Sequence, residues 1–257
     1  MRKATITICL LAGLLVATPA LAGTVIEVNV TGEGTTRMLI SGDRMRMESS
    51  DNVTLFDAAA NEVTVLNLQE QTYHVMTKQD VQRMAKQMQQ VRKQVEQQLQ
   101  NMPEDQRAQM RKQMEQMMPG GGPPPKIRVE PTGGSGIVAG ASCRKARLFR
   151  DDQATHELCV AEPGALGIPS DAFDTMMAMF GFFEEISGAA GGEGADIQVR
   201  AMEEMMSELG GMPARSRPLA GGAAWEIAGV ESRSIDAGQF EVPSGYTEAD
   251  PMSGQMQ

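Results

Sequence analysis

Apolar and polar residues alternate along most of the segment from residue 24 to residue 77. Ile26, Val28 and Val30, for example, are separated by the polar residues Glu27 and Asn29. A period of two is typical of a strand with one buried face. The segment therefore predicts an antiparallel meander with one solvent-exposed face. Its strands are expected at 24–30, on both sides of a turn within 37–48, and at 53–56, 62–68 and 72–77.

Between residues 78 and 118 the pattern changes to the spacing of an α-helix. The stretch contains thirteen Gln and seven Met, and its apolar residues recur in steps of three and four. Pro103 interrupts the pattern, which fits either an αα-hairpin or one helix with a kink. A Gly and Pro run at 119–125 then ends the helix and serves as a hinge. The sequence thus predicts a helical arm inserted into a β domain, with one apolar face that includes Met84, Met88, Val91, Val95, Met110, Met114 and Met117.

Strand-like alternation returns after the arm and then gives way to a second helical region. Strands are expected at 126–130, 136–141, 143–150 and 155–161, and closing strands in 223–234 and 240–246. Ser170 is a suitable N-cap for the first of two helices, and a Gly-rich break at 188–194 separates that helix from the second, at 195–209. The apolar face of the first helix consists of Phe173, Met176, Met177, Phe180 and Phe183, widened by Met179 and Phe182.

These elements define an α+β protein that is mainly β. A chain of 257 residues could form one large domain or two small ones. We expect a single β domain at 23–247, which the helical arm at 78–118 and the hinge at 119–125 interrupt. Trp225, Phe240 and Tyr246 are predicted core residues, and 248–257 is predicted to be a disordered tail.

The two helical regions carry opposite charge. Eight Lys and Arg against five Asp and Glu give +3 for 78–118, whereas nine acids against one Arg give −8 for 171–212. Our hypothesis is that the two regions pack against each other over the sheet. The whole chain carries −10, and an acidic chain without a basic block argues against nucleic acid as a partner.

Residues 1–22 have the three parts of a secretory signal peptide. Arg2 and Lys3 precede an apolar stretch at 6–16 that is too short to span a bilayer comfortably, and Ala20-Leu21-Ala22 fits the cleavage pattern. The alternative is an N-terminal membrane anchor. Cleavage after Ala22 would change the net charge from −10 to −12. It would leave a periplasmic or secreted protein that does not span the membrane.

Two cysteines, Cys143 and Cys159, would then remain in an oxidising compartment. The segment between them centres on a polar turn at Asp151. A hairpin about that turn places position 143 opposite position 159, where Cβ atoms lie about 4.5–5.5 Å apart. A disulfide is therefore expected, with a stabilisation of roughly 3 kcal/mol in the chain-entropy model. The alternatives are two free thiols or a redox site, and the absence of a CxxC motif disfavours the redox site.

Catalytic motifs do not stand out in the sequence. His74 and His156 are the only histidines, and each is most simply an ordinary strand residue. The patterns of zinc proteases, nucleophile elbows and phosphate-binding loops do not occur in the sequence. Met110, Met114 and Met117 could gather Cu(I), but an adaptable apolar face is the simpler interpretation. We therefore expect a protein without a metal or another cofactor, and not an enzyme.

Four short motifs resemble a bacterial secreted family that is number 4412 among the domains of unknown function. They are GDRMRME at 42–48, TYHVM at 72–76, Cys143 followed by basic residues, and FEVPSGY at 240–246. Members often carry Trp in the strand paired with Cys143, where this chain has Cys159, and this departure favours the disulfide. The family is similar to the periplasmic lipoprotein carriers LolA and LolB. The resemblance implies a curved antiparallel sheet, a half-open β-barrel, with helices over its mouth.

The resemblance also implies a function, because carriers of that fold hold acyl chains in the concave face. A lipid or lipoprotein acyl chain is the expected ligand, with Phe173, Met176, Met177, Phe180 and Phe183 as lid or contact residues. The alternative is a protein-interaction module, in which the arm at 78–118 binds a partner helix or self-associates as a coiled coil through its apolar face.

Overall fold

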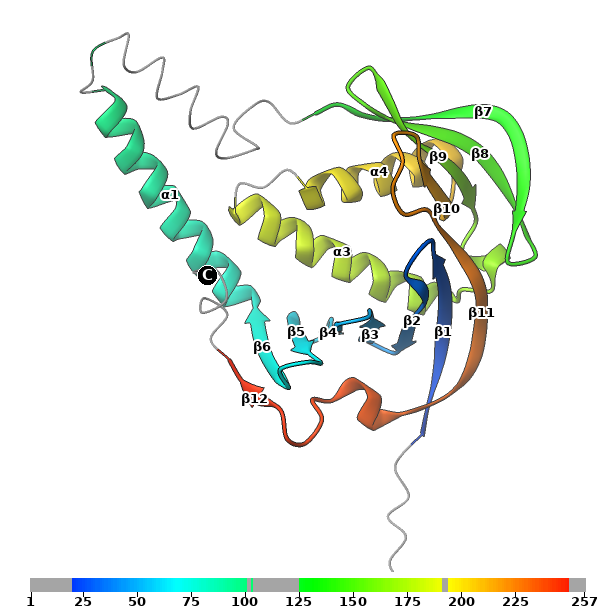
Figure 1. The fold of residues 1–257 in the computed structure, drawn as a ribbon, viewed down its shortest axis with the longest axis horizontal. Helices are drawn as coiled ribbons and strands as arrows, with labels where there is room; N and C mark the ends of the chain where they lie inside the picture. Colours follow the sequence, from blue (N-terminus) through cyan, green and yellow to red (C-terminus); the bar gives the residue numbers. More distant parts are fainter. Residues whose placement is uncertain (1–19, 101–102, 104–124, 191–193, 250–257) are drawn as a thin grey trace, which may run out of the picture.

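The computed structural model describes residues 20–100, 103, 125–190 and 194–249. Their strands form one open, curved sheet in the order β12-β6-β5-β4-β3-β2-β1-β11-β10-β9-β8-β7 (Figure 1). The described helices are α1 (Lys78–Gln100), α3 (Ser170–Ala190) and α4 (Gly194–Leu209), with short 3₁₀ segments η1 (Gly164–Leu166) and η2 (Ala237–Phe240). The strands are β1 (Ala20–Val30), β2 (Gly34–Ser41), β3 (Arg44–Glu48), β4 (Asn52–Asp57), β5 (Glu62–Asn67), β6 (Thr72–Thr77), β7 (Ile127–Val138), β8 (Ala141–Arg150), β9 (Gln153–Ala161), β10 (Met212–Pro218), β11 (Trp225–Asp236) and β12 (Thr247–Glu248).

The mainly β fold and the N-terminal meander confirm the expectation from the sequence. Strands β1 to β6 are successive antiparallel neighbours. A two-residue turn at Gly42 and Asp43 joins β2 to β3, and Gly42 has φ +54°. Positive φ at the first central residue is the geometry of the tight turns that match the twist of a hairpin, and glycine adopts it without strain. The curved sheet is not closed into a barrel, because β12 and β7 are separate edges.

The two halves of the sheet meet where β1 pairs with β11. Beyond β11 the sheet continues antiparallel through β10, β9, β8 and β7. The one parallel pair is β12 with β6, which makes the sheet mixed rather than purely antiparallel. Ordered backbone reaches slightly into the predicted tail, because Glu248 belongs to β12 and the Ala249 N–H donates to the Tyr73 carbonyl at 2.7 Å. Residues 250–257 lie outside the described part.

The helices α3 and α4 lie in the hollow of the curved sheet, whereas α1 leaves the end of β6 and projects away from the strands (Figure 1). On α4, Ala201, Met205 and Leu209 pack with residues of β7, β8 and β9. On α3, Met176, Met179 and Phe182 join the largest buried cluster, which strands from both halves of the sheet complete. The predicted core residues agree with the structure. Phe240 is buried, and Trp225 and Tyr246 are half-buried against core clusters.

The arm begins where the sequence predicts it, and its first turn has a reciprocal cap. The Asp80 N–H donates to Thr77 Oγ1 at 3.3 Å, and the Asp80 carboxylate accepts the Thr77 N–H at 3.0 Å. Such a capping box satisfies donors that the first turn of a helix would otherwise leave unpaired. The structure describes this helix as far as Gln100. The predicted break at Pro103, the second helix of the arm and most of the hinge at 119–125 lie outside the described residues.

The hairpin of β8 and β9 confirms the disulfide but not the predicted register. Cys143 and Cys159 are bonded, with their Cα atoms 5.3 Å apart. The residue opposite Cys159, however, is Lys145, because a bulge after Leu148 shifts the pairing. The turn accounts for the other part of the difference, because it centres between Asp151 and Asp152 and not on Asp151. The disulfide therefore joins diagonal positions, which the twist of the sheet brings within bonding reach. Alternation alone could not have predicted the bulge.

The signal peptide stays a prediction, since residues 1–19 lie outside the described part. Ala20, Leu21 and Ala22 extend β1 and pair with the end of β11, so cleavage after Ala22 would shorten this strand by three residues. No helix among the described residues is long and apolar enough to cross a bilayer.

Candidate functional site

The concave face of the sheet is covered by α3. Phe182 of this helix is 4% exposed, and its ring centroid lies 6.0 Å from that of Phe56 in β4. Met179 and Met176, one turn and two turns earlier, are buried in the same cluster. A hydrogen bond fixes the helix to the sheet as well, because Thr175 Oγ1 donates to the Gly42 carbonyl at 2.8 Å. The helix is thus part of the core and not a separate flap.

Beneath α3 runs one row of directly paired residues across five strands. The row consists of Ile40, Met45, Phe56, Val63 and Met76. The first four are buried, and Met76 is half-buried against the same cluster.

A second row is displaced from the first by two residues in each strand, and it therefore lies on the same face of the sheet. All of its residues are half-buried rather than buried. Three of the five are apolar, and two of those are methionines. We call this set the open row: Met38, Met47, Thr54, Val65 and His74.

The predicted lid residues lie beside the same buried cluster as the open row. Met176 is buried, and Phe173, Met177, Phe180 and Phe183 are half-buried against the cluster. These four residues and the open row together form a partly exposed apolar surface, which we call the candidate face. The position of the buried stripe on α3 differs from the prediction, since it centres on Met179 and Phe182, which only widened the predicted face.

Sequence reasoning did not single out the open row. The signal was present in the alternation of β2, β3 and β5, which places Met38, Met47 and Val65 at inward positions. Which inward positions a helix covers depends on the placement of α3, and that placement follows from packing between distant parts of the chain.

The predicted partner face on the arm is described only in part. The Val91 side chain is 52% exposed, as a residue available to a partner would be. Met84, Met88 and Val95 belong to α1, but their side chains lie outside the described part, as do Met110, Met114 and Met117. The copper hypothesis for the last three is therefore untested. Val81, nearer the start of α1, is 3% exposed and belongs to the main core.

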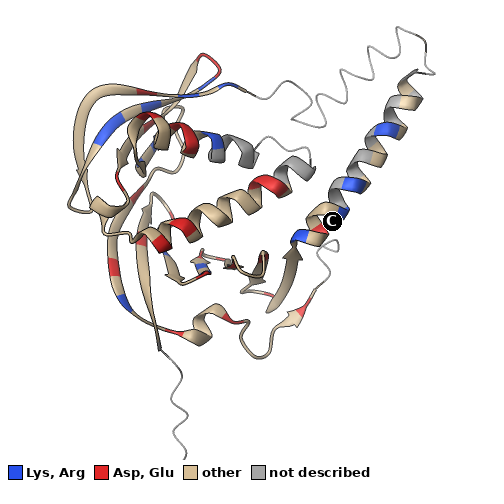
Figure 2. Cartoon of the chain, turned by 180° about the vertical axis from the view of Figure 1, so that it is seen from behind, with Lys and Arg blue, Asp and Glu red and all other residues tan. Residues whose placement is uncertain are grey.

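The base of the arm contacts α3, in line with the hypothesis that the two regions pack together. Val81 packs in the cluster that contains Met176 and Phe182, and Lys78 Nζ lies 3.0 Å from Glu185 Oε1. Both charged side chains are about half exposed, 47% and 50%, so the ion pair contributes little stability by itself. The acidic residues on α3 and the basic residues on α1 are visible in Figure 2.

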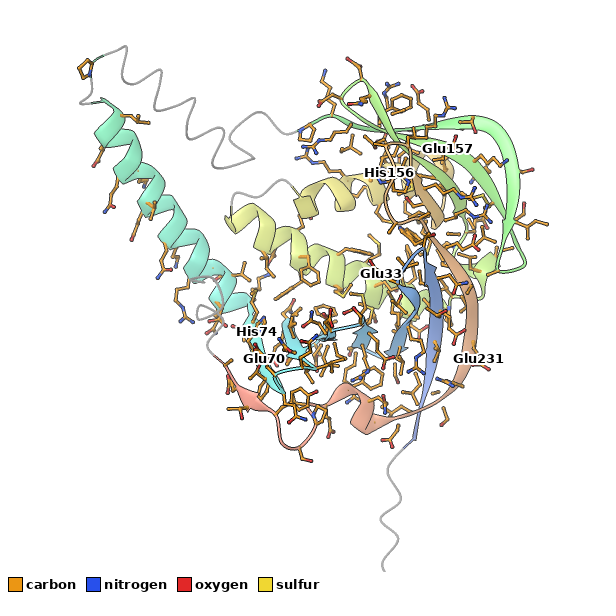
Figure 3. The ribbon with its side chains drawn as sticks, in the orientation of Figure 1. Glu33, Glu70, His74, His156, Glu157 and Glu231 are labelled. Atoms are coloured by element: carbon orange, nitrogen blue, oxygen red, sulfur yellow. A yellow bond between two sulfur atoms is a disulfide. The ribbon has the colours of Figure 1, made fainter. Side chains whose placement is uncertain are left out.

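The histidines do not form a catalytic group. His74 lies in β6 and His156 in β9, in separate parts of the sheet (Figure 3). His156 Nδ1 is 3.0 Å from the hydroxyl of Thr155, and burial lowers the pKa of His156 below its ordinary value. Burial in the strand favours the neutral form of the imidazole, which lowers its pKa. The described residues contain no group of three or more His, Cys, Asp or Glu side chains placed to hold a metal ion.

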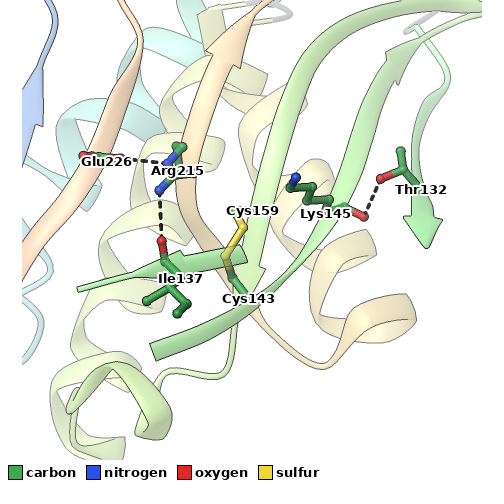
Figure 4. The surroundings of a disulfide bond; sticks show 7 residues. All are labelled: Thr132, Ile137, Cys143, Lys145, Cys159, Arg215 and Glu226. Carbon is green, nitrogen blue, oxygen red and sulfur yellow. Dashed lines mark hydrogen bonds and ion pairs between the residues drawn. A yellow bond between two sulfur atoms is a disulfide. The ribbon is translucent and has the colours of Figure 1, made fainter. Parts of the chain in front are cut away.

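The disulfide occupies a tightly packed corner between β7, β8 and β9 (Figure 4). Cys143 and Cys159 are 2% and 3% exposed. A Cβ atom at Gly136 would lie 3.1 Å from the Cys159 sulfur and 3.5 Å from the Cys143 sulfur. Glycine at this position in β7 therefore leaves room for the bond. The disulfide links β8 to β9.

The observed architecture is that of an open, curved, mainly β protein with helices packed in its hollow. Residues 24–246 match a family described as a domain of unknown function, DUF4412. The chain belongs to this family. Among curated proteins no match is found.

Two solved structures of PNGF-II are similar to this chain only at a low level. The structure in space group C2 has a TM-score of 0.36 and covers 90% of this chain, and the structure in space group P21 has a TM-score of 0.37 and covers 89%. Sequence identity is 11% in both cases, and the chain spans 31% of the length of each PNGF-II chain. Similarity at this level supports no conclusion about the function of the chain.

Proposed function

We propose that this protein is a non-enzymatic binder of an apolar ligand, a lipid or a lipoprotein acyl chain, held in the concave face of the sheet. The open row is the observation that supports the proposal most. It is an inward-facing line of partly exposed side chains, next to the half-buried residues of α3. Covering such surface gains roughly 25 cal/mol for each Å² of apolar area removed from water.

The shape and composition of the candidate face suit an extended ligand. Five directly paired positions span four strand spacings, or about 19 Å at about 4.8 Å per spacing. An extended acyl chain fits a narrow line of this length better than a compact ligand does. Met38 and Met47 are flexible and polarisable, so they can adapt to chains of different length. Binding of this kind needs neither catalytic groups nor a cofactor.

The proposal includes the location of the protein and its nearest functional analogy. Removal of the signal peptide would place it in the periplasm or outside the cell. There it would act on the same class of ligand as the lipoprotein carriers LolA and LolB, to which its family is similar.

Native mass spectrometry of the mature chain, purified from its own compartment, tests the proposal directly. We expect an additional mass that is released on collisional activation and is identified as a lipid. Exchanging Met47→Gln together with Val65→Thr should weaken binding of a fluorescent fatty acid about tenfold, equivalent to about 1.4 kcal/mol. Val91→Thr on the arm is the matched control and should leave that affinity unchanged. A chain that carries no lipid and binds no fatty acid contradicts the proposal.

A second candidate function is a protein-interaction module, favoured by the exposed Val91 on a helix that projects from the sheet (Figure 1). The apolar face of such a helix can dock into a partner groove or pair with a second helix. Two measurements on the whole chain and on a variant lacking 79–118 distinguish the two functions: oligomeric state by analytical ultracentrifugation, and binding of the fluorescent fatty acid. Oligomers that disappear with the deletion support the module, whereas fatty-acid binding that survives it supports the apolar binder.

A further inference from the structure

On the convex side of the other half of the sheet, basic side chains form a regular grid. Lys145, Cys159 and Arg215 are paired across β8, β9 and β10, and Arg147, Glu157 and Arg217 are paired in the next row. The intervening Ala146 and Leu158 pack with α4, so strand alternation places the grid on the opposite, outer face. Together with Thr132 of β7 and parts of Ala146 and Leu158, these residues line a shallow groove of about 240 Å³, which we call the basic groove.

Four cations and one carboxylate line this groove, although the chain as a whole is acidic. Arg147 lies 3.9 Å from Glu157. Arg215 is held by Glu226, just outside the groove, at 2.7 Å and by the Ile137 carbonyl at 3.0 Å (Figure 4). Within the described part of the chain, the Lys145 ammonium and the Arg217 guanidinium have no carboxylate partner. These two cations are therefore available to an external anion.

Two exposed apolar residues lie near the cation grid, outside the lining of the groove. Ile137, whose carbonyl binds Arg215, is 70% exposed and is the most exposed large apolar residue among those described. Leu219 follows Arg217 by two residues, is 47% exposed, and continues the ladder through its N–H, 2.9 Å from the Thr155 carbonyl. Both apolar side chains are thus largely in water, where burial would be favourable.

Cations flanked by apolar side chains are complementary to an anionic lipid surface. Guanidinium and ammonium groups bind lipid phosphates, while neighbouring apolar residues enter the boundary between headgroups and acyl chains. A small free anion would use the cations but not Ile137 and Leu219. An acidic polypeptide would leave these two residues similarly unused. We propose that the basic groove, with Ile137 and Leu219 at its margins, docks this protein onto membranes that contain anionic phospholipid.

The acidic character of the chain does not oppose this docking. The acidic side chains of α3 and α4 belong to helices on the concave side of the sheet, and basic residues lie on the strands of this end (Figure 2). Exposed charges farther apart than about 8 Å are largely screened at physiological ionic strength. The local surface therefore governs docking. The inference concerns a different surface from the candidate face, so its failure would leave the proposed acyl-chain binding intact.

Vesicle flotation of the mature chain tests the inference. We expect binding to vesicles of phosphatidylcholine and phosphatidylglycerol in equal parts, no binding to phosphatidylcholine alone, and weaker binding as salt is raised. Lys145→Gln with Arg217→Gln should weaken binding about 30-fold, since each basic residue near an anionic surface contributes about fivefold. The control is Lys86→Gln with Lys93→Gln, which removes the same charge from exposed positions on α1 and should keep full binding.

A second variant tests the apolar margin separately. Ile137→Ser with Leu219→Ser should weaken vesicle binding while leaving its salt dependence unchanged. All three variants should retain the circular dichroism spectrum and melting temperature of the original chain. Equal vesicle binding by the Lys145 and Arg217 variant would overturn the proposal. So would displacement from vesicles by low millimolar inorganic phosphate, which indicates a small-anion site, or binding to polyglutamate in place of vesicles, which indicates an acidic protein partner.

Discussion

The helices α1 and α3 both contain methionines at helical spacing, yet much of α1 is exposed whereas one side of α3 is buried. Met176 and Phe182 of α3 are 3% and 4% exposed, whereas Val91 of α1 is 52% exposed. The difference follows from the residues that surround the methionines in each helix. In α3 these are Phe, Ala and Thr, so several faces of the helix can enter a core. In α1 they are Gln, Lys and Arg, which confine the apolar residues to a narrow stripe. Methionine content alone does not tell a core helix from an exposed one.

The two helices are also stabilised in different ways. Tertiary packing in the hollow of the sheet stabilises α3, with the hydrogen bond from Thr175 to Gly42 as an anchor. Local interactions in its first turn support α1, where Thr77 and Asp80 cap the helix end. Perturbing α3 should therefore unfold the domain, whereas perturbing the cap or the exposed positions of α1, away from the buried Val81, should loosen the helix with little effect on the sheet.

The largest expected effect is that of Phe182→Ala. It removes a buried aromatic side chain packed on Phe56, so the free energy of unfolding should fall by about 3–5 kcal/mol. Val91→Ala is the matched change on α1 and should shift this free energy by less than about 0.5 kcal/mol. Urea unfolding followed by circular dichroism measures both. A similar decrease in the free energy of unfolding for both substitutions would contradict the proposed difference between the two helices.

A smaller effect is expected from Thr175→Val, which keeps the shape of the side chain but removes its hydroxyl. The Gly42 carbonyl then loses its donor in a partly buried site, at a cost of about 1 kcal/mol. Thr54→Val, at a half-buried position of the open row, is the control and should change the free energy of unfolding little. The same urea titration applies, and a neutral Thr175→Val would mean that apolar packing alone holds α3.

The cap of α1 should give a local effect of about 1 kcal/mol. Thr77→Ala removes the hydroxyl that accepts the Asp80 N–H and donates to the Asp80 carboxylate, and leaves the bond from the backbone N–H of residue 77. Hydrogen exchange should become faster in the first turns of α1 while β2 to β5 stay protected. Faster exchange throughout the sheet would show instead that α1 is needed for the stability of the whole domain.

This cap should also respond to pH. Hydrogen bonds from the Thr77 hydroxyl and amide, helped by Arg83, hold the pKa of Asp80 below its ordinary value, against the opposing effect of burial. The contribution of Asp80 is therefore complete above the ordinary aspartate pKa of about 3.9 and is lost as the pH falls through the lower folded value. Asp80→Asn should abolish this pH dependence of exchange in the first turn of α1.

The smallest effect is expected for the ion pair between the two helices. A double-mutant cycle with Lys78→Gln and Glu185→Gln should give a coupling energy of about 0.2–1 kcal/mol, because both side chains are about half exposed. The coupling should decrease as salt is added. A larger coupling that is insensitive to salt would indicate that α1 is packed more firmly on α3 than the exposure of Val91 suggests.

Local pattern alone determined much of this protein. Strand alternation, polar turns and the change to helical spacing at Lys78 predicted β1 to β6 and the start of α1, because these signals depend on residues close together in the chain. The spacing of Cys143 and Cys159 about a polar turn predicted the disulfide, and the residues at 170–209 predicted two helices. Short motifs predicted the family.

Only the tertiary structure decided the rest. The bulge after Leu148 made the disulfide diagonal, and the fit of α3 against Phe56 turned its buried stripe toward Met179 and Phe182. The same fit left the open row partly exposed. The pairing of β8, β9 and β10 brought together cations of the basic groove that are 72 positions apart in the sequence, Lys145 and Arg217. Such features depend on how distant segments pack and form hydrogen bonds with one another. A local pattern of apolar and polar residues does not contain this information.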